Sequence, residues 1–170
     1  MKRFLYVLYI FLIAVIMIPK EKLYFTFESF LSEYHIFISN EDITNRLVYL
    51  DVNNGSVVLD NQEVATIERI RITPLIFMNQ LTISSISISP LYRSFIPGKI
   101  DTLVLTYTLL HPLSVRIDGS GDFGHCNGNV DLLEQKVRVV FDATPGLRRY
   151  PLLTSQLHQE EGGLVYESNL

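Results

Sequence analysis

The sequence has no tryptophan and a single cysteine, Cys126, among its 170 residues. One cysteine excludes an intramolecular disulfide and any metal site built from several cysteines. Two roles stay open for Cys126, a buried thiol or a disulfide to a second chain. Basic residues are also too few and too scattered to indicate binding of nucleic acid, because the chain has 14 Lys and Arg residues and 18 Asp and Glu residues. We expect one domain, large enough to bury a core without disulfides or metal.

The longest apolar run, residues 4–18, lies between Lys2-Arg3 and Pro19-Lys20. Signal peptidase needs small residues in an A-x-A-like pattern, and Ile16-Met17-Ile18 before Pro19 offers none. The sequence therefore predicts an uncleaved membrane signal anchor over residues 1–20, and we expect the following domain to lie outside the cytoplasm. The side chains expected to contact lipid are Phe4, Leu5, Val7, Leu8, Ile10, Phe11, Leu12, Ile13, Val15, Ile16 and Ile18.

Residues 21–34 show near-helical spacing of Leu23, Phe27, Phe30, Leu31 and Tyr34. This spacing predicts an amphipathic helix directly after the anchor, lying on the bilayer or covering the β domain.

Residues 35–170 are dominated by short alternating segments separated by turn residues. We expect a mainly β fold, an antiparallel β-meander that forms a curved sheet or an open half-barrel, with one or two short helices. Asn53-Asn54-Gly55 predicts a hairpin between strands at 46–52 and 56–60, and Asp60-Asn61-Gln62 predicts the next turn.

Three further features are expected in this domain. The alternation over residues 81–89 slips between Ser85 and Ile86, which predicts a β-bulge. Strands at 129–133 and 136–142 are expected to pair across Leu133-Glu134-Gln135. Residues 145–159 are a second helical candidate, followed by a last strand at 164–167.

A glycine-rich turn motif, Gly119, Gly121, Asp122, Phe123, Gly124 and Gly128, matches G-x-G-x-x-G in its first half. A dinucleotide site also needs a helix that begins at the glycines. Another turn sequence follows here, so a wide hairpin loop is favoured. Asp118, Ser120 and Asp122 fit the first positions of an EF-hand frame, but the required Gly and Glu are missing, which leaves turn carboxylates or a weak cation site.

No catalytic, metal or cofactor site is assigned. His35, His111, His125 and His158 are far apart in the sequence, without the spacing of metal ligands. No serine lies in a G-x-S-x-G elbow, and Cys126 has only His125 as a basic neighbour. We expect a protein that is not an enzyme.

Nearly the whole chain resembles the type II (general) secretion system protein N family, which is related to AsmA-like envelope proteins. The resemblance is carried by residues 22–25 and 35–38, by residues 57–60 and 63–72, and by the turn motif with 128–132. The closing segment 161–167 is also similar. This chain is shorter than typical family members.

The resemblance implies a single-pass protein of the bacterial inner membrane with a periplasmic domain. Its implied role is a non-enzymatic accessory or scaffold component in protein export, with other secretion-system subunits as partners. An AsmA-like module that binds or transfers lipid is the alternative. Neither role involves nucleic acid or a cofactor.

Overall fold

The computed structural model describes residue 6 and residues 19–33, 35–160 and 163–169. The eleven residues expected to contact lipid in the membrane anchor, the first Phe4 and the last Ile18, all lie outside this part of the chain. Among the described residues, no helix combines the length and apolarity needed to span a bilayer.

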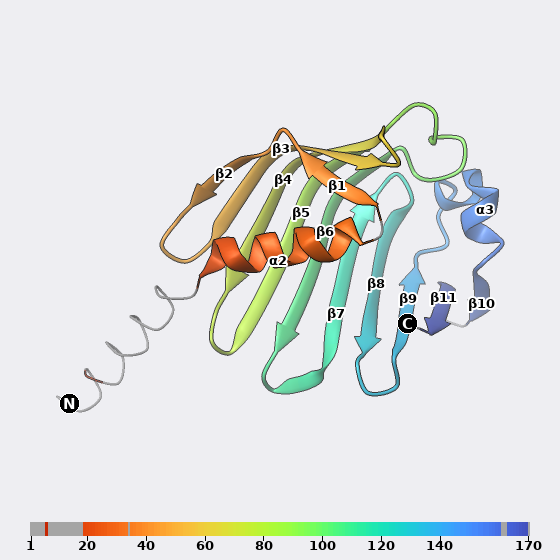
Figure 1. The fold of residues 1–170 in the computed structure, drawn as a ribbon. Coiled ribbons are helices and arrows are strands. Elements are labelled where there is room, and N and C mark those ends of the chain that lie inside the picture. Colours follow the sequence, from red (N-terminus) through yellow and green to blue (C-terminus); the bar gives the residue numbers. More distant parts are fainter. Residues whose placement is uncertain (1–5, 7–18, 34, 161–162, 170) are drawn as a thin grey trace.

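One long helix precedes a series of strands (Figure 1). The elements are α2 (Lys20–Ser32), β1 (Ile36–Ser39), β2 (Asp42–Asn45), β3 (Leu50–Leu59), β4 (Gln62–Pro74), β5 (Met78–Ile88), β6 (Lys99–Thr108), β7 (His111–Gly121), β8 (Gly124–Asp131), β9 (Lys136–Phe141), a 3₁₀ turn η1 (Leu147–Arg149), α3 (Pro151–Thr154), β10 (His158–Glu160) and β11 (Gly163–Asn169).

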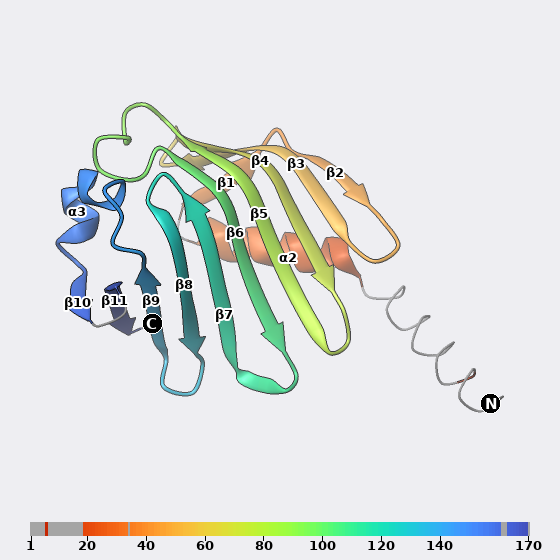
Figure 2. The ribbon, with the colours of Figure 1, turned by 180° about the vertical axis from the view of Figure 1, so that it is seen from behind.

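All eleven strands form one open antiparallel sheet with the order β1-β3-β4-β5-β6-β7-β8-β9-β11-β10. Strands β1 and β2 both pair with β3 and together make one edge, and β10 makes the other. The expected mainly β, antiparallel fold is confirmed. From β3 to β9 the strand order follows the chain, as in a meander (Figures 1 and 2).

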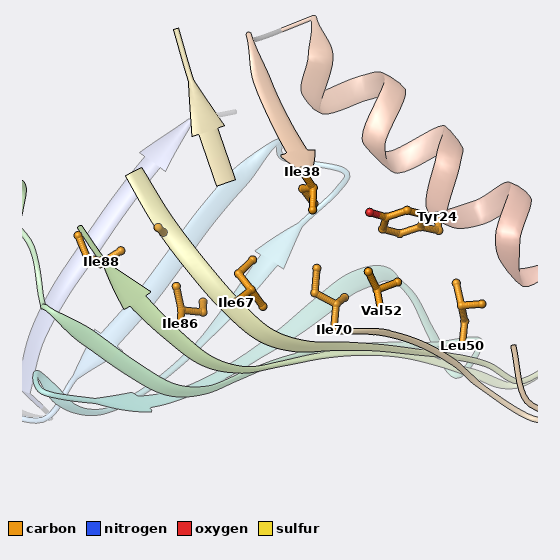
Figure 3. Packing of buried hydrophobic residues seen from close by; sticks show 9 residues of the cluster. Tyr24, Ile38, Leu50, Val52, Ile67, Ile70, Ile86 and Ile88 are labelled. Atoms are coloured by element: carbon orange, nitrogen blue, oxygen red, sulfur yellow. The ribbon is translucent and has the colours of Figure 1, made fainter. Parts of the chain in front are cut away.

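Helix α2 lies across one face of the sheet, which we call the inner face (Figures 1 and 2). Tyr24 is fully buried and packs with Leu50, Val52 and Ile70 in the main core. Figure 3 shows these side chains between the helix and the sheet, which bends around them. Along β4 and β5, the positions that alternate with the buried residues face the other side of the sheet and carry Ser, Thr and charged residues. Burial therefore follows the two-residue period of a strand.

Along each of the strands β3 to β6, successive inward-facing residues are two positions apart in the sequence. At one level of the sheet, the same in all four strands, they are three positions apart. One extra residue per strand causes the wider spacing, and these lie in a row: Asn54, Glu68, Ser85 and Asp101. Asn54 and Ser85 have positive φ, 58° and 55°. The irregularity predicted at Ser85 is therefore present, and it is shared by its neighbours. The row of extra residues ends at β6. Strand β7 has no matching extra residue, so the register between β6 and β7 shifts at this level.

The hairpin expected at Asn53-Asn54-Gly55 was wrong. Strand β3 runs straight through these residues, and the positive φ of Asn54 serves the row of extra residues instead of a turn. The chain reverses at Asp60 and Asn61, where φ values of 48° and 65° fit a two-residue hairpin turn. That second predicted turn is confirmed.

Both helical expectations need correction in detail. The buried side of α2 is centred on Tyr24 and includes the half-buried Leu31, whereas Leu23 and Phe27 are exposed. The expected helix at 145–159 consists only of η1 and α3, which are separated at Tyr150 just before Pro151. The short strand β10 occupies residues that the pattern had assigned to the end of this helix.

Candidate functional site

The glycine-rich motif lies across a tight hairpin rather than a wide loop. Gly119 and Gly121 belong to β7, Gly124 and Gly128 belong to β8, and Gly121 pairs with Gly124. Only Asp122 and Phe123 form the turn. The segment that follows the glycines is a strand, so it offers no helix N-terminus to a phosphate.

The motif closes one end of the inner face. Phe123 is buried in a second core with Cys126 and Leu147. The Thr144 hydroxyl donates a hydrogen bond to the Phe123 carbonyl oxygen at 2.7 Å and accepts one from the Leu147 N–H at 3.3 Å. Gly121 has no room for a side chain, because a Cβ there would lie 2.5 Å from the Lys99 carbonyl oxygen. We read this motif as a packing element.

Cys126 is buried in the same core, opposite Gly119 on the neighbouring strand. Burial, with the nearby Asp118 and Asp142 carboxylates, raises the pKa of the Cys126 thiol to about 11. A protonated, inaccessible thiol fits the expected buried role, and in this fold it is not placed to form a disulfide with a second chain.

The acidic frame that suggested a cation site is stretched out along β7. Asp118 and Ser120 face Asn127 and His125 of β8, and only Asp122 lies in the turn. An EF-hand loop curls its ligands around one point, which an extended strand cannot do. Asp122 is therefore a turn carboxylate, as in the first alternative, whereas Asp118 and Ser120 are strand residues.

His158, Glu160 and Glu167 form the one group among the described residues with ligand atoms close enough to hold a metal ion. Arg138 contacts both carboxylates, with its Nη1 2.9 Å from Glu167 Oε1 and its Nη2 on Glu160. The His158 Nε2 lies 3.1 Å from Glu160 Oε1. Arg138 is already paired with both carboxylates, so the group is an exposed ion-pair network. The other three histidines are exposed and lie in separate places.

The inner face is only partly covered by α2. Beyond the helix, half-buried apolar residues continue across β6 to β9, among them Leu105, Ile117, Val130 and Val139. Their register places them on the same face as the main core. This stretch forms an apolar floor that described parts of the chain leave open.

A pocket of about 520 Å³ lies where this floor meets the start of α2. Leu23 of the helix forms one wall, and the pocket is lined mostly by apolar side chains from the ends of four strands: Ile72, Pro74, Leu75, Leu81, Leu105, Tyr107 and Val115. Asn79, Gln80 and Thr73 supply polar groups. Size and lining are typical of sites for apolar ligands.

A small acidic cluster lies near the covered part of the inner face. Burial, and then the Glu41 and Glu28 carboxylates, raise the pKa of the Tyr24 hydroxyl above its ordinary value. Burial and Glu41 also raise the pKa of Glu28. The tyrosine therefore stays protonated and neutral at physiological pH.

The pocket was not anticipated from the sequence. Its lining brings together residues from four strands, a turn and α2, and its wall depends on where α2 crosses the sheet. Leu23 was expected on the apolar side of the helix, and it is 46% exposed and lines the pocket. The comparisons with known proteins add no relative, since no family model, no curated protein and no solved structure matches the chain.

Proposed function

We propose that this chain is a non-enzymatic accessory component of a type II (general) secretion system, acting through protein–protein contacts. It would be held in the inner membrane by residues 4–18, with its β domain in the periplasm. The proposal is supported by the family resemblance of the sequence and by one structural observation, the sheet that does not close.

An open sheet leaves a row of unpaired backbone N–H and C=O groups at each edge. Such edges accept an additional strand from a partner. Here β10 is a short edge whose three residues, His158–Glu160, are all exposed. At the other end β2 exposes its backbone alongside β3, and Thr44 faces the side away from α2.

The contact is testable with photo-cross-linking in cells. A cross-linking amino acid at Gln159 or Thr44 is expected to capture inner-membrane secretion subunits, since both residues lie on edge strands. The matched position is Ser84 in the middle of β5, on the same face as Thr44 but enclosed by neighbouring strands. A full-length chain that gives no secretion subunit from either edge, and migrates as a solitary monomer in mild detergent, would contradict the proposal.

A second function, lipid binding in the envelope, is favoured by the apolar pocket beside Leu23. A pocket of about 520 Å³ lined by Leu81, Leu105 and Val115 has the size and the apolar lining to hold part of an acyl chain. In this reading the open floor of the inner face extends the site.

Adjacent residues of β6 provide a matched pair for the lipid test. Leu105 lines the pocket, whereas Val104 pairs with Asp118 on the opposite face. Native mass spectrometry of the full chain in mild detergent is expected to show bound phospholipid that Leu105→Gln loses and Val104→Gln keeps. Repeated absence of lipid from the unaltered chain would exclude this second function and leave the first untouched.

A further inference from the structure

Four turns of the meander lie at the same end of the sheet. Alternate turns of an antiparallel meander fall on one side, and here these are residues 46–49, 75–77, 109–110 and 132–135. Figure 1 shows them along the lower margin of the sheet. The turns between β3 and β4, β5 and β6, and β7 and β8 lie at the opposite end.

Each of the four turns exposes large apolar side chains. Leu47 is 60% exposed, Phe77 63%, Leu110 87% and Leu133 73%. Together with the exposed Leu109 and Leu132 they form what we call the leucine rim. Turns that face water favour Gly, Asn, Asp and Ser, so leucine pairs in two of these turns need another explanation.

The start of α2 lies at the same end as the leucine rim. Asn45, beside the first rim turn, donates a side-chain hydrogen bond to Glu21 Oε1 at 2.9 Å. Leu23 shares the pocket with Leu75 of the second rim turn. The helix thus begins next to two of the four turns.

Chain length then limits how far the apolar run can be from the rim. Only Pro19 separates Ile18 from Lys20, the first residue of α2. Two peptide units span about 7 Å at most. The apolar run therefore joins the described chain beside the first two rim turns, 46–49 and 75–77.

We propose that the leucine rim rests on the lipid bilayer, with its side chains inserted at the boundary between headgroups and acyl chains. This inference relies on the proposed anchoring of residues 4–18 and adds a second set of lipid contacts. Exposed Arg46 in the first turn and Lys22 on α2 lie at the same end, where they can meet lipid phosphates. The sheet then stands on the membrane, with its strands directed away from it.

The opposite end differs in composition. Its turns include Asp60-Asn61 and Asp122, which are polar and exposed. One loop, residues 89–98, exposes Leu91 and Phe95 there. Leu91 is 76% exposed, which is similar to the exposed fraction of the rim leucines, so it provides a matched probe at the far end of the sheet.

The test measures depth in the membrane at single positions of the full chain. In a Cys126→Ala background, Leu110→Cys, Leu133→Cys or Leu91→Cys is labelled with an environment-sensitive fluorophore. The proteins are reconstituted into vesicles of phosphatidylethanolamine and phosphatidylglycerol, with and without doxyl-labelled phospholipid. Labels at 110 and 133 are expected to shift to the blue and to lose most of their fluorescence with doxyl lipid. The label at 91 should keep its fluorescence.

A fourth probe, Phe11→Cys, separates the inference from the anchoring on which it relies. If the label at 11 is quenched while those at 110 and 133 stay bright, the anchor stands and bilayer contact by the rim is wrong, which leaves the rim for a protein partner. If the label at 11 also stays bright, the anchoring itself fails. Circular dichroism of each labelled variant verifies that the β fold is retained.

Discussion

The guanidinium of Arg71 donates two hydrogen bonds to the Asp51 carboxylate, Nε to Oδ1 at 2.7 Å and Nη2 to Oδ2 at 2.9 Å. These residues face each other on β4 and β3, on the outer side of the sheet. The guanidinium also lies 4.2 Å from the ring centroid of Tyr49. The Arg71 guanidinium is thus held by the Asp51 carboxylate and by the ring of Tyr49.

The first prediction concerns this pair. The hydrogen bonds from Arg71 hold the pKa of Asp51 below its ordinary value. A carboxyl with a lowered folded-state pKa stabilises the fold above its unfolded-state pKa, and this contribution disappears as pH falls through the folded-state value. Asp51→Asn should cost about 1 kcal/mol at neutral pH, since the arginine is partly exposed. In strongly acidic solution the variant and the unaltered protein should converge.

Urea unfolding of the full chain in detergent, at neutral and acidic pH, measures this difference. Asp101→Asn is the control because its pair with Lys99, 2.8 Å apart, is more than half exposed on both sides. Equal losses for the two variants, or a loss at Asp51 that persists in acid, would contradict the assignment.

The second prediction tests the docking of α2. Tyr24→Ala removes a fully buried ring and should lower the free energy of unfolding by about 3 kcal/mol. Phe25→Ala, one position along the same helix, removes a ring that is 51% exposed and should cost far less. The midpoint of thermal unfolding, followed by circular dichroism, reports both. Comparable shifts would show that the helix does not hold the sheet through Tyr24.

The third prediction concerns Gly121. A Cβ at this position meets the Lys99 carbonyl oxygen at 2.5 Å and the Ile100 Cα at 2.9 Å, and neither backbone atom can move without shifting β6. We expect Gly121→Ala to destabilise the fold by about 2 kcal/mol. At Gly98 the nearest atoms lie at 3.4 Å, so Gly98→Ala should be tolerated. Denaturation midpoints of the two variants decide the matter, and an unchanged Gly121→Ala would refute the packing role of the motif.

The fourth prediction concerns Cys126. With its pKa raised to about 11 and its side chain 5% exposed, the thiol should react very slowly with a disulfide reagent at mildly alkaline pH. It should react rapidly once the protein is unfolded in guanidinium chloride. A cysteine introduced at Leu91 in the Cys126→Ala background is the accessible reference. Rapid labelling of native Cys126, or a disulfide-linked dimer on a non-reducing gel, would contradict the burial.

The sequence predicted the class of fold because period-two alternation and turn residues are local signals. The turn at Asp60-Asn61 followed directly from residue chemistry, and the turn at Leu133-Glu134-Gln135 followed from the alternating segments on either side of it. The segment Asn53-Asn54-Gly55 was misread because positive φ is needed both in hairpin turns and in irregular strands. Only the matching irregularities in adjacent strands distinguish the two, and those depend on register.

The candidate sites were less accessible to sequence reading. The pocket depends on the crossing of α2 over the sheet, which no local pattern specifies. The leucine rim was recognised only from the structure, which places Leu109-Leu110 and Leu132-Leu133 in turns, whereas the sequence pattern assigned Leu132 and Leu133 to a strand at 129–133. Residues of that kind are unusual in turns exposed to water.

The meander also bears on how the domain forms. Each strand from β4 to β8 pairs only with the strand before it and the strand after it, so most sheet contacts join strands that are consecutive in the chain. Short sequence separation lowers the entropy lost in closing each loop and favours rapid folding among β proteins. A chain that emerges from a membrane with its N-terminus first can therefore extend this sheet one strand at a time. The hairpin of β10 and β11 is then added last.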